Sequence, residues 1–329
     1  MKTMTPTKEK PQLTANRTPA LQIKTILVPL DFSRASMHAL KYTIALAEEF
    51  NAAIHLAHVQ PADKFTAIPN AGAQMMNCAD AIALMQDRLA EVQEKHDVKF
   101  WPDNCHVVSG KPYEEIVKLA RELHIDLVVL STRGHSGLKR IALGSTAERV
   151  VRFASCPVLI PRGAKFDAMT WNAEKPEKFS PRRILVPVDF SDCALAGLKY
   201  AALLAKRFNA KLQLFHVISP HMEVFQINRS DGAATPLIEN ARASAKEEMG
   251  RLRCLDFMNG VSCETKICVG GVVDEICGES GEGKVDLIIT STHGHTGFKH
   301  AMLGSVSEQV VRYAERPVLV VPSRGVIPR

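Results

Sequence analysis

The sequence predicts an α/β protein of two tandem doubly wound domains, each a five-stranded, mainly parallel sheet with helices on both faces. Three observations lead to this prediction. Short runs of apolar, β-branched residues alternate with helical patterns along the chain. The run "TILVPL" is continuously apolar, as a strand is when helices cover both faces of a sheet. The whole pattern then repeats about 160 residues later in the chain.

Strands and helices of the first copy can be assigned in order. A strand at 25–30 ("TILVPL") ends before Ser33, a residue type that caps the helix expected at 34–50. Pro112 lies near the start of another helix, a position where proline is favoured. The remaining elements are a strand at 53–59, a long helix reaching about Val98, a strand at 105–110, a helix at 113–124, a strand at 126–131, a helix at 145–154 and a strand at 157–161.

The second copy follows the same order, from "ILVPVDFS" to "PVLVVP". Residues 25–59 and 183–217 are identical at 18 of 35 aligned positions, and residues 130–160 and 290–320 at 17 of 31. A repeat of this length is a whole domain and not a unit of a solenoid. The chain is therefore predicted to have arisen by duplication of one domain.

The domain boundaries follow from composition. We expect domains over 25–162 and 183–323, joined by a linker over 163–182 that contains Pro, Lys and Glu. The tails, 1–24 and 324–329, carry charges of +4 and +2, which account for the net charge of +6 and leave the body of the protein near neutral. A Pro- and Thr-rich basic tail is typical of solvated, disordered chain, so we expect no nucleic-acid partner.

Bulk properties exclude further classes. The 329 residues, 46% apolar and 23% charged, fit two ordinary globular domains. No apolar run approaches the roughly 18 residues of a membrane span, and the N-terminal stretch lacks the apolar core of a secretory signal. Eight cysteines without any C-x-x-C spacing favour free thiols. We therefore expect a cytoplasmic protein that does not bind membranes.

A glycine-punctuated loop follows the fourth strand of each copy: "STRGHSGLKRIALGS", 131–145, and "STHGHTGFKHAMLGS", 291–305. A loop that leads from a strand into a helix N-terminus offers amide N–H groups and a positive dipole end to phosphate. An alternative stays open, because Ser145 and Glu148, like Ser305 and Glu308, fit a capping box that satisfies those amides internally. The residues Asp31 and Val59 end the first two strands and belong to the same rim of the sheet.

Other motifs are weaker. "GESGEGK", 278–284, matches part of a P-loop, but it runs from a helix into a strand and lacks the Ser or Thr that binds Mg²⁺. His135 and His295 have no second ligand at metal-binding spacing. His58 and His216, which end strands, are expected to be packed or bonded to the backbone. Neither G-x-S-x-G nor H-E-x-x-H occurs, so we expect no catalytic residues and no metal site.

The spacing G-9x-G-S in both loops resembles the universal stress protein family, whose nucleotide-binding members carry G-2x-G-9x-G-[S/T]. The resemblance includes "ILVPLDFS" and "ILVPVDFS", the strand endings "AHV" and "FHV", and the closing "CPVLI" and "RPVLVV". It covers nearly all of both domains and implies an adenine-nucleotide α-hydrolase-like fold. It departs at Ser131 and Ser291, which stand where the family motif has its first glycine.

The resemblance also implies site residues. Pro29, Asp31, Pro187 and Asp189 resemble residues that face the adenosine, and Val59 and Val217 resemble the apolar contact to adenine. The phosphate would be held by Gly134, Gly144, Ser145 and Thr146 in the first copy and by Gly294, Gly304, Ser305 and Val306 in the second. Ser131 and Ser291 complete the expected nucleotide-binding set.

Three functional hypotheses follow. The first is a cytoplasmic stress-response protein that binds ATP or AMP, with Mg²⁺ as a candidate companion ion, and acts as a regulatory or protective factor. The second is a slow ATPase or self-phosphorylating protein. The third is a ligand-free structural or chaperone-like scaffold. In each case the resemblance implies that the last strands, "CPVLIP" and "RPVLVVP", pair as a pseudo-dimer within the chain, and it leaves association of two chains open.

Overall fold

The computed structural model describes residues 21–61, 102–131, 143–162, 178–219, 234–281, 284–292 and 304–323, together with residues 80, 83, 86 and 87. The predicted long helix that reaches Val98 lies mostly outside these residues, although the four isolated ones are helical. Gly134 and Gly294 also lie outside them.

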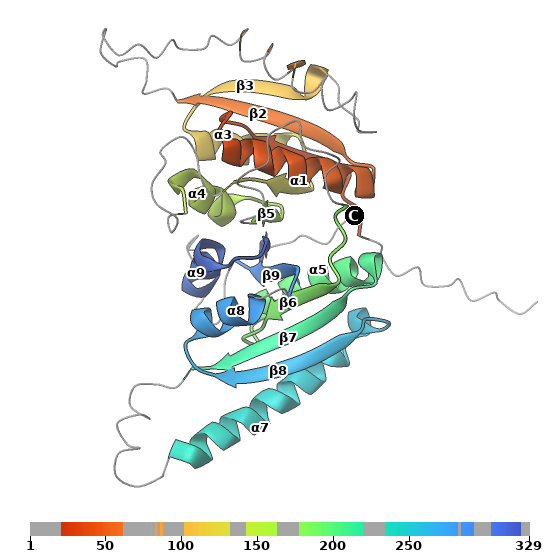
Figure 1. Ribbon diagram of the computed structural model, residues 1–329, viewed down its shortest axis with the longest axis vertical. Helices are drawn as coiled ribbons and strands as arrows, with labels where there is room; N and C mark the ends of the chain where they lie inside the picture. The colour runs from red at the N-terminus through yellow and green to blue at the C-terminus, as the bar shows by residue number, and fades with distance from the viewer. Residues whose placement is uncertain are drawn as a thin grey trace, which may run out of the picture.

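The first copy contains the expected alternation of strands and helices (Figure 1). Its elements are β1 (Thr25–Pro29), α1 (Arg34–Phe50), β2 (Ala53–Pro61), the 3-10 helix η2 (Pro102–Asn104), β3 (Cys105–Gly110), α3 (Pro112–Glu122), β4 (Leu127–Val129), α4 (Ser145–Phe153) and β5 (Val158–Ile160). The second copy repeats this order as β6 (Arg183–Pro187), α5 (Asp192–Phe208), β7 (Lys211–Ile218), α7 (Ala234–Arg253), η4 (Asp256–Met258), β8 (Cys263–Val269), α8 (Val272–Ser280), β9 (Leu287–Ser291), α9 (Ser305–Tyr313) and β10 (Val318–Val321).

The helix ends explain why the chain turns where it does. The Ser33 side chain accepts the amide of Ser36 at the start of α1, as predicted, and Pro112 begins α3. α1 ends at Asn51, which takes the left-handed conformation at φ 52° that asparagine tolerates well. In the second copy Asn209 ends α5 in the same way, at φ 50°.

The two domains share one sheet. Its ten strands lie in the order β3-β2-β1-β4-β5-β10-β9-β6-β7-β8 (Figure 1). Within each half, all neighbouring strands are parallel. The halves join through β5 and β10, which are antiparallel with Val158 opposite Val320 and Ile160 opposite Val318. The predicted pairing of the last strands within the chain is thus confirmed, and it converts two five-stranded sheets into a single continuous one.

Each face of the sheet carries one hydrophobic core that runs through both domains. Alternate strand residues point to opposite faces, so Ile26 and Val28 lie in one core and Leu27 in the other. The first core is covered by α1, α5 and α7, and the second by α3, α4, α8 and α9. The inner strands β1, β4 and β5 are buried on both sides, which is why their sequences are apolar, whereas the outer strands β3 and β8 are only partly buried and contain polar residues.

Contacts between the last turns of α1 and α5 hold the domains together on the first face. Arg207 of α5 donates to the carbonyl of Glu49 at 2.7 Å and to its carboxylate at 3.2 Å. The rings of Phe50 and Phe208 meet edge to face, with centroids 5.8 Å apart. We call the contact surface formed by these four residues and the β5–β10 pair the seam.

The second face has its own link across the seam. The guanidinium of Arg162, which follows β5, donates to the carbonyls of Val311 and Arg312 near the end of α9. A helix C-terminus carries unpaired carbonyls and a partial negative charge, so an arginine there satisfies both.

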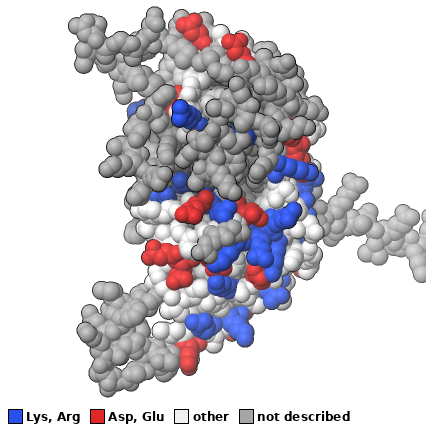
Figure 2. All heavy atoms as spheres, in the orientation of Figure 1, with Lys and Arg blue, Asp and Glu red and all other residues white. Residues whose placement is uncertain are grey.

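The surface of the described residues carries charges of both signs. Figure 2 shows Lys and Arg interspersed with Asp and Glu on the visible face of the second domain, in keeping with a near-neutral folded body. Among the helices of the described ranges, none combines the length and the apolar composition that crossing a membrane requires.

A double-mutant cycle tests the seam. We expect Arg207→Glu to lower the free energy of unfolding by about 1 kcal/mol, because a paired charge becomes a repulsive one. Adding Glu49→Arg should restore part of that loss. Chemical denaturation of the four proteins measures the coupling; strictly additive effects would show that the pair does not stabilise the seam.

Candidate functional site

The candidate site lies where the direction of chain travel across the sheet reverses. β1 lies between β2 and β4, and β6 between β7 and β9, so each half has its switch point beside its central strand. Crevices outside the carboxyl ends of such strands are the usual ligand sites of doubly wound sheets. The structure brings Pro29, Val59 and Ser131 to neighbouring strand ends in the first copy. Pro187, Val217 and Ser291 occupy the equivalent places in the second, and all but Ser291 are half-buried.

A strained turn follows the central strand of each copy. Phe32 has φ 61° and Phe190 φ 63°, in the left-handed region that bulky residues rarely adopt. The carboxylate of Asp31 accepts the amide of Ser33 at 3.0 Å. In the second copy Asp189 accepts both the amide of Ser191, at 3.0 Å, and its hydroxyl, at 2.6 Å.

Histidines on the adjacent strand hold this turn in place. His58 Nδ1 lies 2.8 Å from the carbonyl oxygen of Leu30, and the His58 and Phe32 ring centroids are 4.9 Å apart. His216 makes the same contacts with the Val188 carbonyl, at 2.8 Å, and with Phe190, at 4.5 Å. Because a carbonyl only accepts, Nδ1 carries the proton in both residues.

The predicted backbone bonding of these histidines is confirmed, but sequence reasoning missed their role. They fix a positive-φ turn that carries a rim aspartate. Backbone strain of this kind persists only where the surroundings enforce it, and its presence in both copies marks the rim as a functional candidate. The sequence signal for this role is the histidine that occurs in both copies two residues after a leucine, in "LAHV" and in "LFHV".

The helices that follow the glycine loops do not use the predicted capping box. α4 begins at Ser145 with Gly144 as its N-cap, and α9 at Ser305 with Gly304, and neither N-cap makes a side-chain hydrogen bond. The capping-box alternative is therefore wrong. Serine occupies the first helical position, one residue too late for its hydroxyl to cap the helix.

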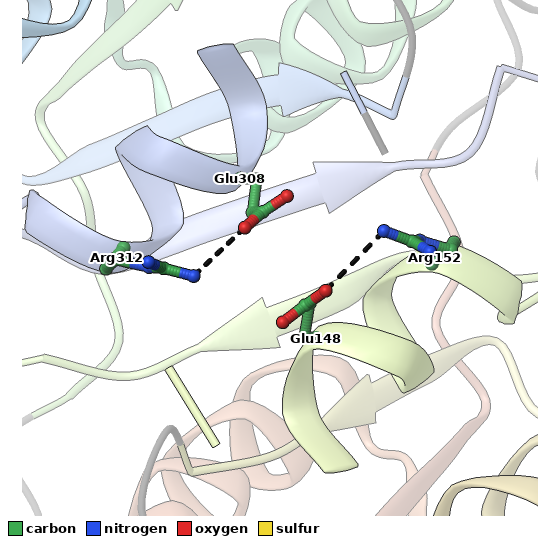
Figure 3. A network of polar contacts seen from close by, with 4 residues as sticks. All are labelled: Glu148, Arg152, Glu308 and Arg312. Atoms are coloured by element: carbon green, nitrogen blue, oxygen red, sulfur yellow. Dashed lines mark hydrogen bonds and ion pairs between the residues drawn. The ribbon is translucent and has the colours of Figure 1, made fainter. Parts of the chain in front are cut away.

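The glutamates of the supposed capping boxes pair with arginines instead (Figure 3). Glu148 contacts Arg152 at 3.5 Å, and Glu308 contacts Arg312 at 3.0 Å, each one turn along the same helix. Figure 3 shows the two pairs facing each other between α4 and α9. A carboxylate near a helix N-terminus opposes a bound anion, and here a guanidinium offsets that charge in both copies.

The first turns of these helices contain amides that have no acceptor within the helix. The amide of Glu148 donates to the carbonyl of Gly144, so the amides of Ser145, Thr146 and Ala147 precede the first helical hydrogen bond. Ser145 is exposed, and Gly144 and Thr146 are half-buried. Gly304, Ser305 and Val306 repeat these environments in the second copy.

Serine in place of the first motif glycine is accommodated inside the fold in the second copy. Ser291 is 7% exposed. A Cβ built on Gly197 of α5 would lie 3.7 Å from the Ser291 Cβ, which places that side chain against α5. Thr290, the preceding residue, points to the opposite face, where its hydroxyl meets Ser307 of α9. The Ser291 side chain is therefore directed away from α9, and Ser131 in the first copy is half-buried.

Two weaker candidates came from the sequence, and the histidines of the first, His135 and His295, lie outside the described residues. No group of three or more His, Cys, Asp or Glu side chains among the described residues has the arrangement of a metal site. The P-loop-like "GESGEGK" begins in α8, which ends at Ser280 with Gly281 as its C-cap. A phosphate-binding loop would have to lead into a helix and not out of one.

Comparison with known proteins agrees with the repeat and the fold. The model of the universal stress protein family matches residues 22–162 and again 181–322. A universal stress protein of Methanocaldococcus jannaschii is 35% identical over 144 residues, which cover 43% of this chain and 84% of that protein. The Bacillus subtilis protein YxiE is 31% identical over 144 residues, 42% of this chain and 97% of its own.

Solved structures share the two-domain arrangement. The crystal structure of a universal stress protein from Archaeoglobus fulgidus aligns over 92% of this chain and 100% of its own, with a TM-score of 0.57 and 22% identity. A Pseudomonas aeruginosa protein of unknown function aligns over 91% and 92%, with a TM-score of 0.60 and 18% identity. At these identities the likeness concerns the fold.

A histidine pair outside the rim distinguishes the first domain from the second. His55 Nδ1 and His106 Nε2 are 3.2 Å apart, on β2 and β3. Burial lowers the pKa of both imidazoles, and the charge of His106 lowers that of His55 further. In the second copy Gln213 and Lys266 occupy these places and both bond Glu279.

This pair predicts a pH dependence of stability. A base whose pKa is lowered by folding is protonated more readily in the unfolded chain, so stability is complete above the ordinary histidine pKa of about 6.5 and falls as the pH drops below it. We expect the double variant His55→Gln/His106→Gln to lose less stability between pH 7.5 and pH 5 than the wild type. Denaturation curves at both values measure this, and parallel losses in the two proteins would contradict it.

Proposed function

Because this chain belongs to the universal stress protein family, we propose that it binds an adenine nucleotide, ATP or AMP, at the rim of one or both domains and acts as a regulatory or protective factor in the cytoplasm. The observation that carries the proposal is the open first turn of α4 and α9. Each begins at a glycine N-cap, follows a strand end at the switch point, and leaves its first amides without helical partners. A phosphate is the ligand that such a helix start fits.

The family motif assigns the parts of the nucleotide. Gly144, Ser145 and the amide of Thr146 would hold phosphate in the first copy, with Gly134 completing the motif. Gly304, Ser305, the amide of Val306 and Gly294 would do so in the second. Mg²⁺ would be bound through the phosphates.

The remaining rim residues would hold the nucleoside. Pro29 and Asp31 in the first copy, with Pro187 and Asp189 in the second, would face the adenosine. Val59 and Val217 would contact adenine. The strained turn supports this assignment, because it holds each aspartate at the end of its central strand.

The enzyme alternative requires a hydroxyl that could accept a phosphoryl group. Ser145 and Ser305 are exposed hydroxyls beside the proposed phosphate, and they are the candidates for self-phosphorylation. Thr146 and Ser307 carry further hydroxyls in the same first turns. Ser307 is 7% exposed and donates to the Ser291 carbonyl, which makes it a poor acceptor of a phosphoryl group. Activation of a hydroxyl nucleophile requires a base within hydrogen-bond reach.

The test places a carboxylate at the first position of both helices. We expect Ser145→Glu/Ser305→Glu to weaken ATP binding by at least about tenfold, since the new charge repels phosphate. The melting temperature should not fall, because the same charge is favourable at a helix N-terminus. Isothermal titration calorimetry and thermal unfolding of the full chain measure both effects.

The matched control is Ser145→Gln/Ser305→Gln, which has the same size and no charge. It should bind more tightly than the glutamate variant. If the wild type gives neither heat nor a thermal shift with ATP or AMP, the proposal is wrong and the scaffold hypothesis gains support. Stoichiometric phosphorylation of the protein or steady release of ADP would instead favour the enzyme hypothesis, and mass spectrometry of ATP-treated protein detects the first.

A further inference from the structure

The end of the fourth strand is built differently in the two domains. β9 runs from Leu287 to Ser291, whereas β4 stops at Val129, two residues short of the equivalent Ser131. The difference lies at the base of the glycine loop, where the chain passes from the strand toward the proposed phosphate site. It is therefore a difference between the two candidate sites themselves.

β9 is longer because Thr290 and Ser291 pair with Val320 and Val321 of β10, whereas β4 pairs with β5 only as far as Val129. Two buried hydroxyls then connect the end of this longer strand to α9. Ser307 of α9 donates its hydroxyl to the carbonyl of Ser291 at 2.6 Å. That leaves the Ser307 oxygen to accept from the hydroxyl of Thr290, 3.1 Å away. Thr290 and Ser307 are each 7% exposed, so these bonds are shielded from water. The first copy has Leu130 and Ala147 at the two equivalent positions, and neither residue can make such a bond.

Backbone contacts close the base of the same loop. The amide of Thr292 donates to the carbonyl of Val321 on β10 at 3.1 Å, and the amide of Gly304 donates to the carbonyl of Thr292 at 2.7 Å. The Thr292 hydroxyl accepts the amide of Ser323 at 3.2 Å. The end of β9 and the start of α9 are therefore hydrogen-bonded to each other. The residues involved are Thr290, Ser291, Thr292, Gly304 and Ser307.

We propose that Ser307 is a positioning residue of the second nucleotide site. This inference rests on the proposed function. The Ser307 hydroxyl fixes the first turn of α9 against the end of β9, so that the amides of Ser305 and Val306 are in place before a phosphate arrives. A site that is ordered in advance binds without the cost of ordering its own backbone. The second domain consequently binds a nucleotide monophosphate more tightly than the first.

The experiment uses the full chain and reads the two sites separately. Hydrogen–deuterium exchange with mass spectrometry follows peptides at the end of β9 and the start of α9, and their counterparts at β4 and α4, during titration with AMP. AMP is the probe because Arg133, Lys139 and Arg140 of the first loop would favour additional phosphates for a separate reason.

We expect slower exchange at the end of β9 than at the end of β4 without ligand, and protection of α9 at lower AMP concentration than α4. Ser307→Ala should reduce the first difference, although the pairing of β9 with β10 remains, and weaken the second site about three- to tenfold, the loss expected from one neutral hydrogen bond. Ser307→Thr, which keeps the hydroxyl, should restore both. Leu130→Thr/Ala147→Ser should slow exchange at the end of β4.

The matched control is Ser280→Ala. Ser280 is also a buried serine, but its hydroxyl donates to the Cys277 carbonyl of its own helix, at 2.8 Å. The Ser280→Ala variant should have a lower melting temperature, but AMP should protect its α9 from exchange as in the wild type. If Ser307→Ala binds AMP at the second site as the wild type does, or loses no more than Ser280→Ala, the positioning role is refuted while the proposed function stands. If AMP protects neither site in the wild type, both fail together.

Discussion

The antiparallel pairing of β5 with β10 is the contact on which the architecture depends. A five-stranded half would end in an edge strand of Val, Leu and Ile with unpaired backbone groups, which is prone to association. Pairing the two edges removes both at once and makes one sheet of ten strands. It also merges the cores, so that each hydrophobic layer extends through both domains. The arrangement of α4 beside α9, and thus of the two candidate sites, follows from that pairing.

Much of this fold could be predicted from the sequence, because its signals are local and occur twice. Strands such as "TILVP" are apolar on both sides, Ser33 and Pro112 mark helix starts, and the repeat shows that these are features of a whole domain. Fusion of the sheets was expected only from the family resemblance. No spacing within one domain shows which edge will meet another, since that depends on surfaces distant in the sequence.

The site could be predicted less completely. The motif located the rim, but it did not distinguish a capping box from an open helix start, because Ser145 fits both until the exact first helical residue is known. The role of His58 could not be predicted, since it depends on the positive φ of Phe32, a conformation that the sequence does not indicate for phenylalanine. The contact between the hydroxyls of Thr290 and Ser307 could not be predicted either, because only tertiary packing brings these two residues together.

The meeting of Glu49 with Arg207 has a consequence for how the two halves can change over time. The two residues occupy equivalent positions of the duplicated domain, as do Phe50 and Phe208. In a symmetric pair of identical domains, a residue on the axis faces its own copy, and a charge there would face a like charge. Joining the copies in one chain lifts that restriction, and the two positions now carry opposite charges. Each half therefore complements the other specifically. Two identical copies of either half could not form this contact, because both would carry the same charge at this position.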